Sequence, residues 1–174
     1  MMASTVFLDC EFTSLASPLL LSVGLSGLDG AEFYGEYALG SSKLKQLVRK
    51  ANTFSQDTVL PQFGVLPQAY ETSLELAKAV ASWLASLPAP VQVAYDYGAD
   101  FELLERLLQE NHLWTSLEPR LVPTHVAYLW GDDSAQAAAD ESWRNTFAEH
   151  YVERHHALAD ARALKAAYRA VHGD

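Results

Sequence analysis

The chain is short of cysteine, of long apolar runs and of basic side chains, and each shortage excludes a class of protein. Cys10 is the only cysteine among 174 residues, which excludes an intrachain disulfide and a cysteine-based zinc site. No apolar run approaches the roughly 18 residues that a membrane-spanning helix needs. The first residues lack the basic segment and apolar core of a signal peptide, so we expect a cytoplasmic location and no membrane partner.

The shortage of Lys and Arg leaves a formal net charge of −10. This charge disfavours binding along an extended duplex, which relies on a basic surface. It still allows an enzyme that grips a few nucleotides at a strand end, and carboxylates that bind divalent ions account for part of the charge. The length, with 49% hydrophobic and 20% charged residues, is typical of one globular domain over 1–174.

Hydrophobic periodicity predicts an α/β fold. Three strands with short turns between them are expected over 5–12, 18–28 and 32–39, and they predict an antiparallel meander. Beyond them we expect helices over 44–51, 74–87, 101–109, 134–151 and 157–171, strands over 91–95 and 121–129, and a long loop over 52–68. This order predicts a mixed sheet, an antiparallel meander plus parallel strands, flanked by helices.

Asp9 and Glu11 end the first predicted strand. Side chains alternate along a strand, so these two carboxylates share one face and Cys10 points to the other. Hard divalent cations such as Mg²⁺ or Mn²⁺ favour oxygen ligands of this kind. A solvated strand end is the alternative for a lone pair of acids at this spacing.

Two more carboxylates stand on the core-facing side of predicted helices. Asp100 lies four residues before Leu104 and Asp160 four residues before Leu164, in line with the apolar stripe of each helix. Burying a carboxylate there is costly unless it is paired or binds a metal. For Asp100, helix capping is the alternative.

His155 precedes Asp160 by five residues, which would place the two side chains about 140° apart on one helix. The two can act together only if His155 lies on the loop before the helix. Four acids and a histidine match the needs of two-metal phosphodiester hydrolysis, in which a base deprotonates the attacking water. His156 is the alternative base, or a cap of the helix.

The three motifs resemble those of the DEDDh 3′→5′ exonuclease superfamily, which has a ribonuclease-H-like fold. They read Phe7-Leu8-Asp9-Cys10-Glu11-Phe12, Asp100-Phe101-Glu102-Leu103-Leu104 and His155-His156-Ala157-Leu158-Ala159-Asp160-Ala161. Within the superfamily the chain looks most similar to compact bacterial and phage 3′→5′ exoribonuclease-like proteins. One departure is Asp96, because many members have asparagine four residues before the second-motif aspartate. An extra acid there could perturb the metal site from behind the ligands, or simply face solvent.

The resemblance implies a site and a substrate. Asp9, Glu11, Asp100 and Asp160 would hold two Mg²⁺ or Mn²⁺ ions, His155 would be the general base, and Phe12, Thr13 and Leu15 would contact the terminal nucleotide. The substrate would be a 3′ end of single-stranded RNA or DNA, with RNA slightly favoured, and the products nucleoside monophosphates. For Phe12, an ordinary core position is the alternative. A catalytically silent binding module, a ribonuclease-H-type endonuclease and a homodimer are left open.

Overall fold

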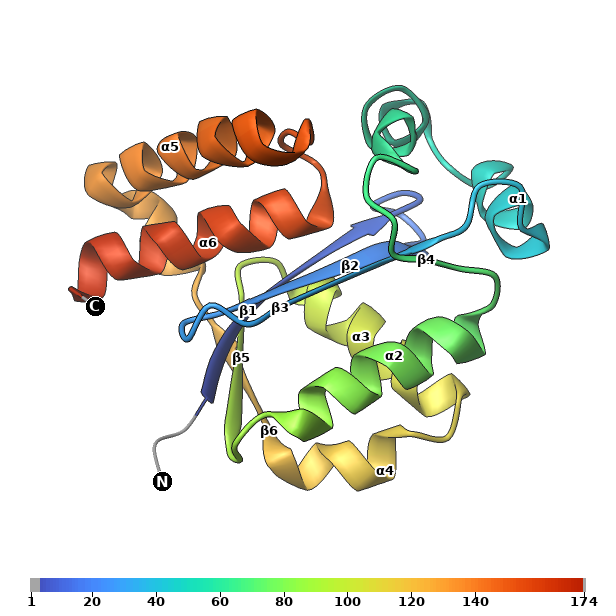
Figure 1. Ribbon diagram of the computed structural model, residues 1–174, viewed down its shortest axis with the longest axis horizontal. Helices are drawn as coiled ribbons and strands as arrows, with labels where there is room; N and C mark the ends of the chain where they lie inside the picture. The colour runs from blue at the N-terminus through green and yellow to red at the C-terminus, as the bar shows by residue number, and fades with distance from the viewer. Residues whose placement is uncertain (1–3, 174) are drawn as a thin grey trace.

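The computed structural model describes residues 4–173, which form a six-stranded mixed sheet with helices on both faces (Figure 1). The spatial order of the strands is β4-β3-β2-β1-β5-β6. β1, β2 and β3 pair antiparallel, whereas β5 runs parallel to β1, β6 to β5, and β4 to β3. The strands are β1 (Ser4–Phe12), β2 (Leu20–Gly27), β3 (Glu32–Tyr37), β4 (Ala69–Tyr70), β5 (Val91–Tyr95) and β6 (Leu121–His125).

The helices form two layers. Helices α5 and α6 cover one face of the sheet, and α2, α3 and α4 lie on the other (Figure 1). Their bounds are α1 (Ser42–Val48), α2 (Ser73–Ser86), α3 (Gly98–Glu110), α4 (Trp114–Leu117), α5 (Asp133–His150) and α6 (Ala157–His172). The largest apolar cluster lies between the sheet and α2 and α3, and a smaller one lies under α5 and α6.

Strand β1 contributes to both layers because its side chains alternate. Leu8 and Cys10 belong to the large apolar cluster, while Phe7 belongs to the cluster under α6. Asp9 and Glu11 have the parity of Phe7, so β1 directs two carboxylates toward the face that carries α6.

Gly24 on β2 lets α6 approach the sheet closely. It pairs with Asp9 in the β1–β2 ladder, and a Cβ atom at this position would lie 2.3 Å from the carbonyl carbon of Ala157. A methyl group does not fit at such a distance, so glycine is needed where the first turn of α6 crosses β2. This contact brings the start of α6 over the acidic end of β1.

The predicted α/β mixed sheet flanked by helices is confirmed, with local corrections. The strand expected over 121–129 ends at His125, since residues 127–131 form a 3-10 turn. The expected loop over 52–68 contains a π-helical turn and a 3-10 turn, and β4 and α4 were not predicted. Among residues 4–173, no helix is both long and apolar enough to cross a membrane.

Candidate metal centre and active site

The carboxylates of Asp9 and Glu11 project from the end of β1, at the edge where α3 and α6 begin. Glu11 is 8% exposed, and the Oδ2 atom of Asp9 is buried without a hydrogen-bond partner among the described residues. Cys10 points away from them into the core, as the strand parity predicted. Two acids therefore share one face of β1 without a basic partner between them.

Asp100 stands in the first turn of α3, yet it does not cap that helix. The residue is 2% exposed, and its Oδ1 accepts a hydrogen bond of 3.2 Å from the Cys10 backbone N–H. Its Oδ2 is buried with no partner within the described chain. The bond to β1 draws this carboxylate toward Asp9, so the capping alternative does not hold.

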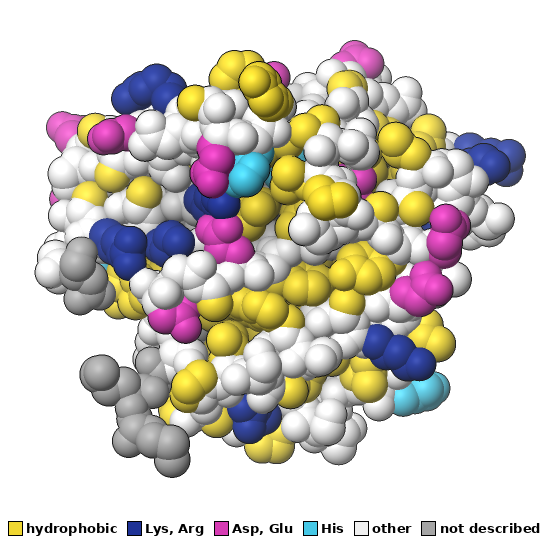
Figure 2. Space-filling view, in the orientation of Figure 1, with side chains coloured by type: hydrophobic (Ala, Val, Ile, Leu, Met, Phe, Trp, Pro, Cys, Tyr) yellow, Lys and Arg dark blue, Asp and Glu magenta, His cyan; other side chains and the backbone are white. Residues whose placement is uncertain are grey.

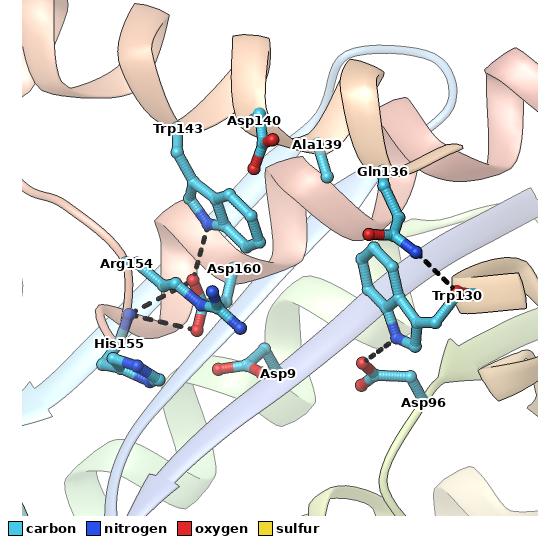
Figure 3. Close-up of a pocket in the computed structure, with 10 residues that line it drawn as sticks. All are labelled: Asp9, Asp96, Trp130, Gln136, Ala139, Asp140, Trp143, Arg154, His155 and Asp160. Carbon is cyan, nitrogen blue, oxygen red and sulfur yellow. Dashed lines mark hydrogen bonds between the residues drawn. The ribbon is translucent and has the colours of Figure 1, made fainter. Parts of the chain in front are cut away.

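Asp160 lies in the first turn of α6, and its carboxylate is held by three contacts. Its Oδ1 accepts a hydrogen bond of 2.7 Å from Trp143 Nε1, and both of its oxygens lie 3.2 Å from the backbone nitrogen of His155. Figure 3 shows the indole and the His155 N–H meeting the carboxylate from two sides. These donors fix the carboxylate beside Asp9.

The acids and His155 form two groups, and within each group the possible ligand atoms lie within 4.8 Å of one another. One group is Glu11, His155 and Asp160, and the other is Asp9, Asp96 and Asp100. The sequence-predicted acids are thus brought together, and Asp96 joins them.

Burial and mutual repulsion raise the pKa of every predicted acid of this cluster. Burial, followed by the charge of Asp96, raises the pKa of Asp100 to about 8. Burial raises the pKa of Asp160 to about 7, and burial with the surrounding carboxylates raises the pKa values of Asp9 and Glu11 well above their usual range. A bound divalent cation would reverse this effect by favouring the charged forms. The buried carboxylate oxygens that lack a hydrogen-bond partner, Oδ2 of Asp9 and Oδ2 of Asp100, are hard ligands of the kind that such a cation favours.

His155 lies on the loop between α5 and α6, as its spacing to Asp160 predicted. Its backbone has φ of 66°, in the left-handed region that residues other than glycine seldom adopt, and a ring nitrogen lies within 4.8 Å of a carboxylate oxygen of Asp160. Gln62 anchors this loop, accepting from the Glu153 N–H at 2.9 Å and donating to the Arg154 carbonyl at 3.0 Å. The imidazole meets Phe54 edge to face at 4.9 Å. Burial, with the neighbouring Arg154, lowers the pKa of His155 from 6.5.

His156 is placed differently and cannot reach the cluster. Its side chain is 2% exposed and stacks on Tyr34, with ring centres 4.4 Å apart. Although the residue precedes α6, its side chain makes no capping hydrogen bond. Burial lowers the pKa of His156 to about 4. Of the two histidines, His155 is the one that faces the acids.

Two cavities meet at the acidic cluster, and both are lined by Asp9, Asp96, His155 and Asp160. The first has a volume of about 400 Å³ and apolar walls. Phe12 and Tyr97 stack on each other there with ring centres 6.1 Å apart, while Leu15 is 71% exposed. The residues that line it beyond the shared four are Cys10, Glu11, Phe12, Ser14, Leu15, Asn52, Phe54, Tyr97 and Asp100.

Thr13, predicted to contact the nucleotide, does not line this cavity. Its side chain is fully buried, where its hydroxyl donates to the Ser17 carbonyl at 3.3 Å and accepts from the Leu19 N–H at 3.2 Å. The Thr13 side chain therefore shapes the loop after β1 instead of facing a ligand.

The second cavity has a volume of about 340 Å³ and is bounded by two tryptophans (Figure 3). The Trp130 Nε1 donates to Asp96 at 2.6 Å, as the Trp143 Nε1 does to Asp160. The guanidinium of Arg154 lies 4.7 Å from the ring centre of Trp143. No motif or periodic pattern in the sequence singled out either tryptophan. Their one available signal was an indole N–H, which needs an acceptor when partly buried.

Comparison with known proteins supports the fold and leaves the family unassigned. No family model and no curated protein matches the chain. Among solved structures it is similar to exonuclease I in its apo form, with a TM-score of 0.54 and 13% identity over 98% of this chain. It is also similar to E. coli exonuclease I in complex with a dA16 oligonucleotide, with a TM-score of 0.52 and 12% identity over 98% of this chain. The chain covers only 42% and 41% of those proteins.

Proposed function

We propose that the protein is a metal-dependent 3′→5′ exonuclease that hydrolyses single-stranded nucleic acid to nucleoside monophosphates by a two-metal mechanism. The observation that carries the proposal is the position of the acidic cluster. Asp9, Glu11, Asp100 and Asp160 meet between two cavities, with His155 at their border. A scissile phosphate at this junction would leave a nucleoside on either side.

The carboxylates would hold two Mg²⁺ or Mn²⁺ ions. When bound, such ions stabilise charge on the attacking and leaving oxygens of a phosphodiester. The protein contributes the placement of the acids, through the Cys10 N–H at Asp100 and the indole of Trp143 at Asp160. His155 would accept the proton of the attacking water, because burial keeps its imidazole neutral at neutral pH.

The apolar cavity suits a terminal nucleoside. Phe12, Tyr97 and Phe54 offer aromatic surface, and stacking on aromatic rings tolerates any base. Phe12 and Leu15 would pack against the base. The sequence resemblance gives RNA a slight preference over DNA as substrate.

The charge distribution favours a short contact with the strand. On the face shown in Figure 2, Lys and Arg side chains are scattered among uncharged and acidic ones. Among the residues that line the two cavities, Arg154 is the one Lys or Arg side chain. Few phosphate contacts suffice for an enzyme that acts at a strand end, in line with a net charge of −10. The oligonucleotide bound by E. coli exonuclease I, on a similar fold, is consistent with a single-stranded ligand.

Digestion of matched RNA and DNA strands, labelled at either end, tests the proposal. With Mg²⁺ or Mn²⁺ we expect the 3′ label to be released first as a mononucleotide and the 5′ label to pass through a ladder of shortened strands. Asp9→Ala and addition of EDTA should each abolish both. Intact strands under all metal conditions would contradict the proposal and favour a silent binding module, whereas internal fragments would favour an endonuclease.

A further inference from the structure

Asp96 occupies a place in the cluster that the four motif acids do not explain. It directly follows β5 and precedes α3, and one of its carboxylate oxygens lies within 4.8 Å of ligand atoms of Asp9 and Asp100. It also lines both cavities. The sequence-based expectation placed this residue behind the ligands or in solvent, whereas the structure places it among them.

Trp130 fixes the Asp96 carboxylate in this position. Its Nε1 donates to Oδ2 of Asp96 at 2.6 Å, and its own carbonyl accepts from Gln136 Nε2 at 2.8 Å (Figure 3). An indole N–H is a donor only, so it engages one oxygen of the carboxylate and leaves the other free. The free oxygen can face a ligand, in the way that a metal-binding side chain is oriented by a neighbour that holds its far side.

A cation explains the atoms around Asp96 better than any protein group does. Asp100 is 2% exposed, and both its Oδ2 and the Oδ2 of Asp9 are buried without a hydrogen-bond partner among residues 4–173. Arg154, the one Lys or Arg side chain in the lining of the cavities, has its guanidinium 4.7 Å from the ring centre of Trp143, and its charge acts on Asp160. Three carboxylates within 4.8 Å repel one another unless positive charge lies between them.

We propose that Asp96 is a direct ligand of one of the two divalent cations, together with Asp9 and Asp100, and that Trp130 is its positioning residue. The inference rests on the proposed function and deepens it. Asparagine at the same position would offer a neutral amide oxygen, whereas Asp96 adds a negative charge to the cation's surroundings. The cation held by this group should therefore bind more tightly than it would beside asparagine.

Mn²⁺ titration of the full chain, with free Mn²⁺ measured by electron paramagnetic resonance, tests this assignment. The wild type should bind two ions. Asp96→Asn keeps an acceptor for Trp130 and removes one charge, so one of the two sites should weaken by at least about 100-fold, the upper end for loss of a residue that only orients a ligand. Trp130→Phe should weaken the same site by about 10- to 100-fold. Asp140 is an exposed acid in the lining of the second cavity but outside the cluster, so Asp140→Asn should change the Mn²⁺ affinity of neither site.

The outcomes separate this inference from the function it rests on. Two sites of unchanged affinity in Asp96→Asn would overturn the assignment of Asp96, and the proposed function would stand if that variant still shortened strands from the 3′ end. A wild type that binds no Mn²⁺ would overturn both. Thermal unfolding in EDTA shows whether Asp96→Asn is still folded. Trp130→Phe is a second variant, which retains the Asp96 carboxylate.

Discussion

Replacing Asp100 with asparagine is expected to make the metal-free protein more stable while it weakens metal binding. The carboxyl group of Asp100 has its pKa raised from 3.8 to about 8, first by burial and then by the charge of Asp96. A pH of 7 is about three units above the ordinary pKa of this group, and each unit corresponds to about 1.4 kcal/mol. Keeping the Asp100 carboxyl group protonated in the folded protein therefore costs folding on the order of 4 kcal/mol.

Asparagine has nearly the same shape and avoids that cost. Its amide oxygen can accept the hydrogen bond from Cys10, although the buried NH₂ group needs acceptors of its own, which costs about 1–3 kcal/mol when they are imperfect. We therefore expect a net gain of about 1–3 kcal/mol. For a chain of this length that raises the melting temperature by roughly 3–10 °C.

Thermal unfolding in EDTA, from pH 4 to pH 8, provides the assay. A raised folded-state pKa favours folding most below pH 3.8, and this contribution is lost as pH rises through about 8. Asp100→Asn should therefore be no more stable than the wild type near pH 4, where only the cost of its buried NH₂ group remains, and it should become the more stable of the two toward pH 8. Asp140→Asn should stay within about 0.5 kcal/mol of the wild type. No gain for Asp100→Asn at pH 7 to 8 would refute the reasoning.

Three further predictions concern the base, the helix contact and the second cavity. His155→Ala should slow hydrolysis by about 10²–10⁴-fold and leave the affinity for metal unchanged. In a pH–rate profile, the wild type should lose rate as the pH falls below the lowered pKa of His155, and the variant should not show this loss. Gly24→Ala should cost about 1–3 kcal/mol in urea unfolding, since the added methyl meets the α6 backbone, whereas Gly131→Ala meets nothing within 4 Å and should leave the site active. Trp143→Phe should weaken metal binding by about 10–100-fold in calorimetric titration, because Asp160 loses its indole donor; unchanged affinity would exclude that role.

The parts of the site that follow local periodicity could be predicted from the sequence. Asp9 and Glu11 share a strand face because side chains alternate, and Asp160 faces the sheet because it is in line with Leu164 on α6. The same arithmetic placed His155 on the loop. Each of these inferences needs only the geometry of one element and its neighbour in the chain.

Residues brought to the site by tertiary contacts could not be predicted. Trp130 and Asp96 are separated by 34 residues and Trp143 and Asp160 by 17, and no periodic pattern links them. Phe54 comes from the irregular segment 52–68, where prolines and a π-helical turn hide any spacing. Thr13 shows the opposite limit, because proximity to a motif does not say which way the side chain of a loop residue points.

The central claim is that the acidic cluster directs hydrolysis to a strand end in a metal-dependent reaction. The most direct measurement is a time course on a 5′-labelled linear single strand and its circularised copy, with Mg²⁺ or Mn²⁺. We expect that the linear strand shortens one nucleotide at a time from its 3′ end, that the circle stays intact, and that Asp160→Asn leaves both untouched. Cutting of the circle, or hydrolysis that persists in Asp160→Asn, would contradict it.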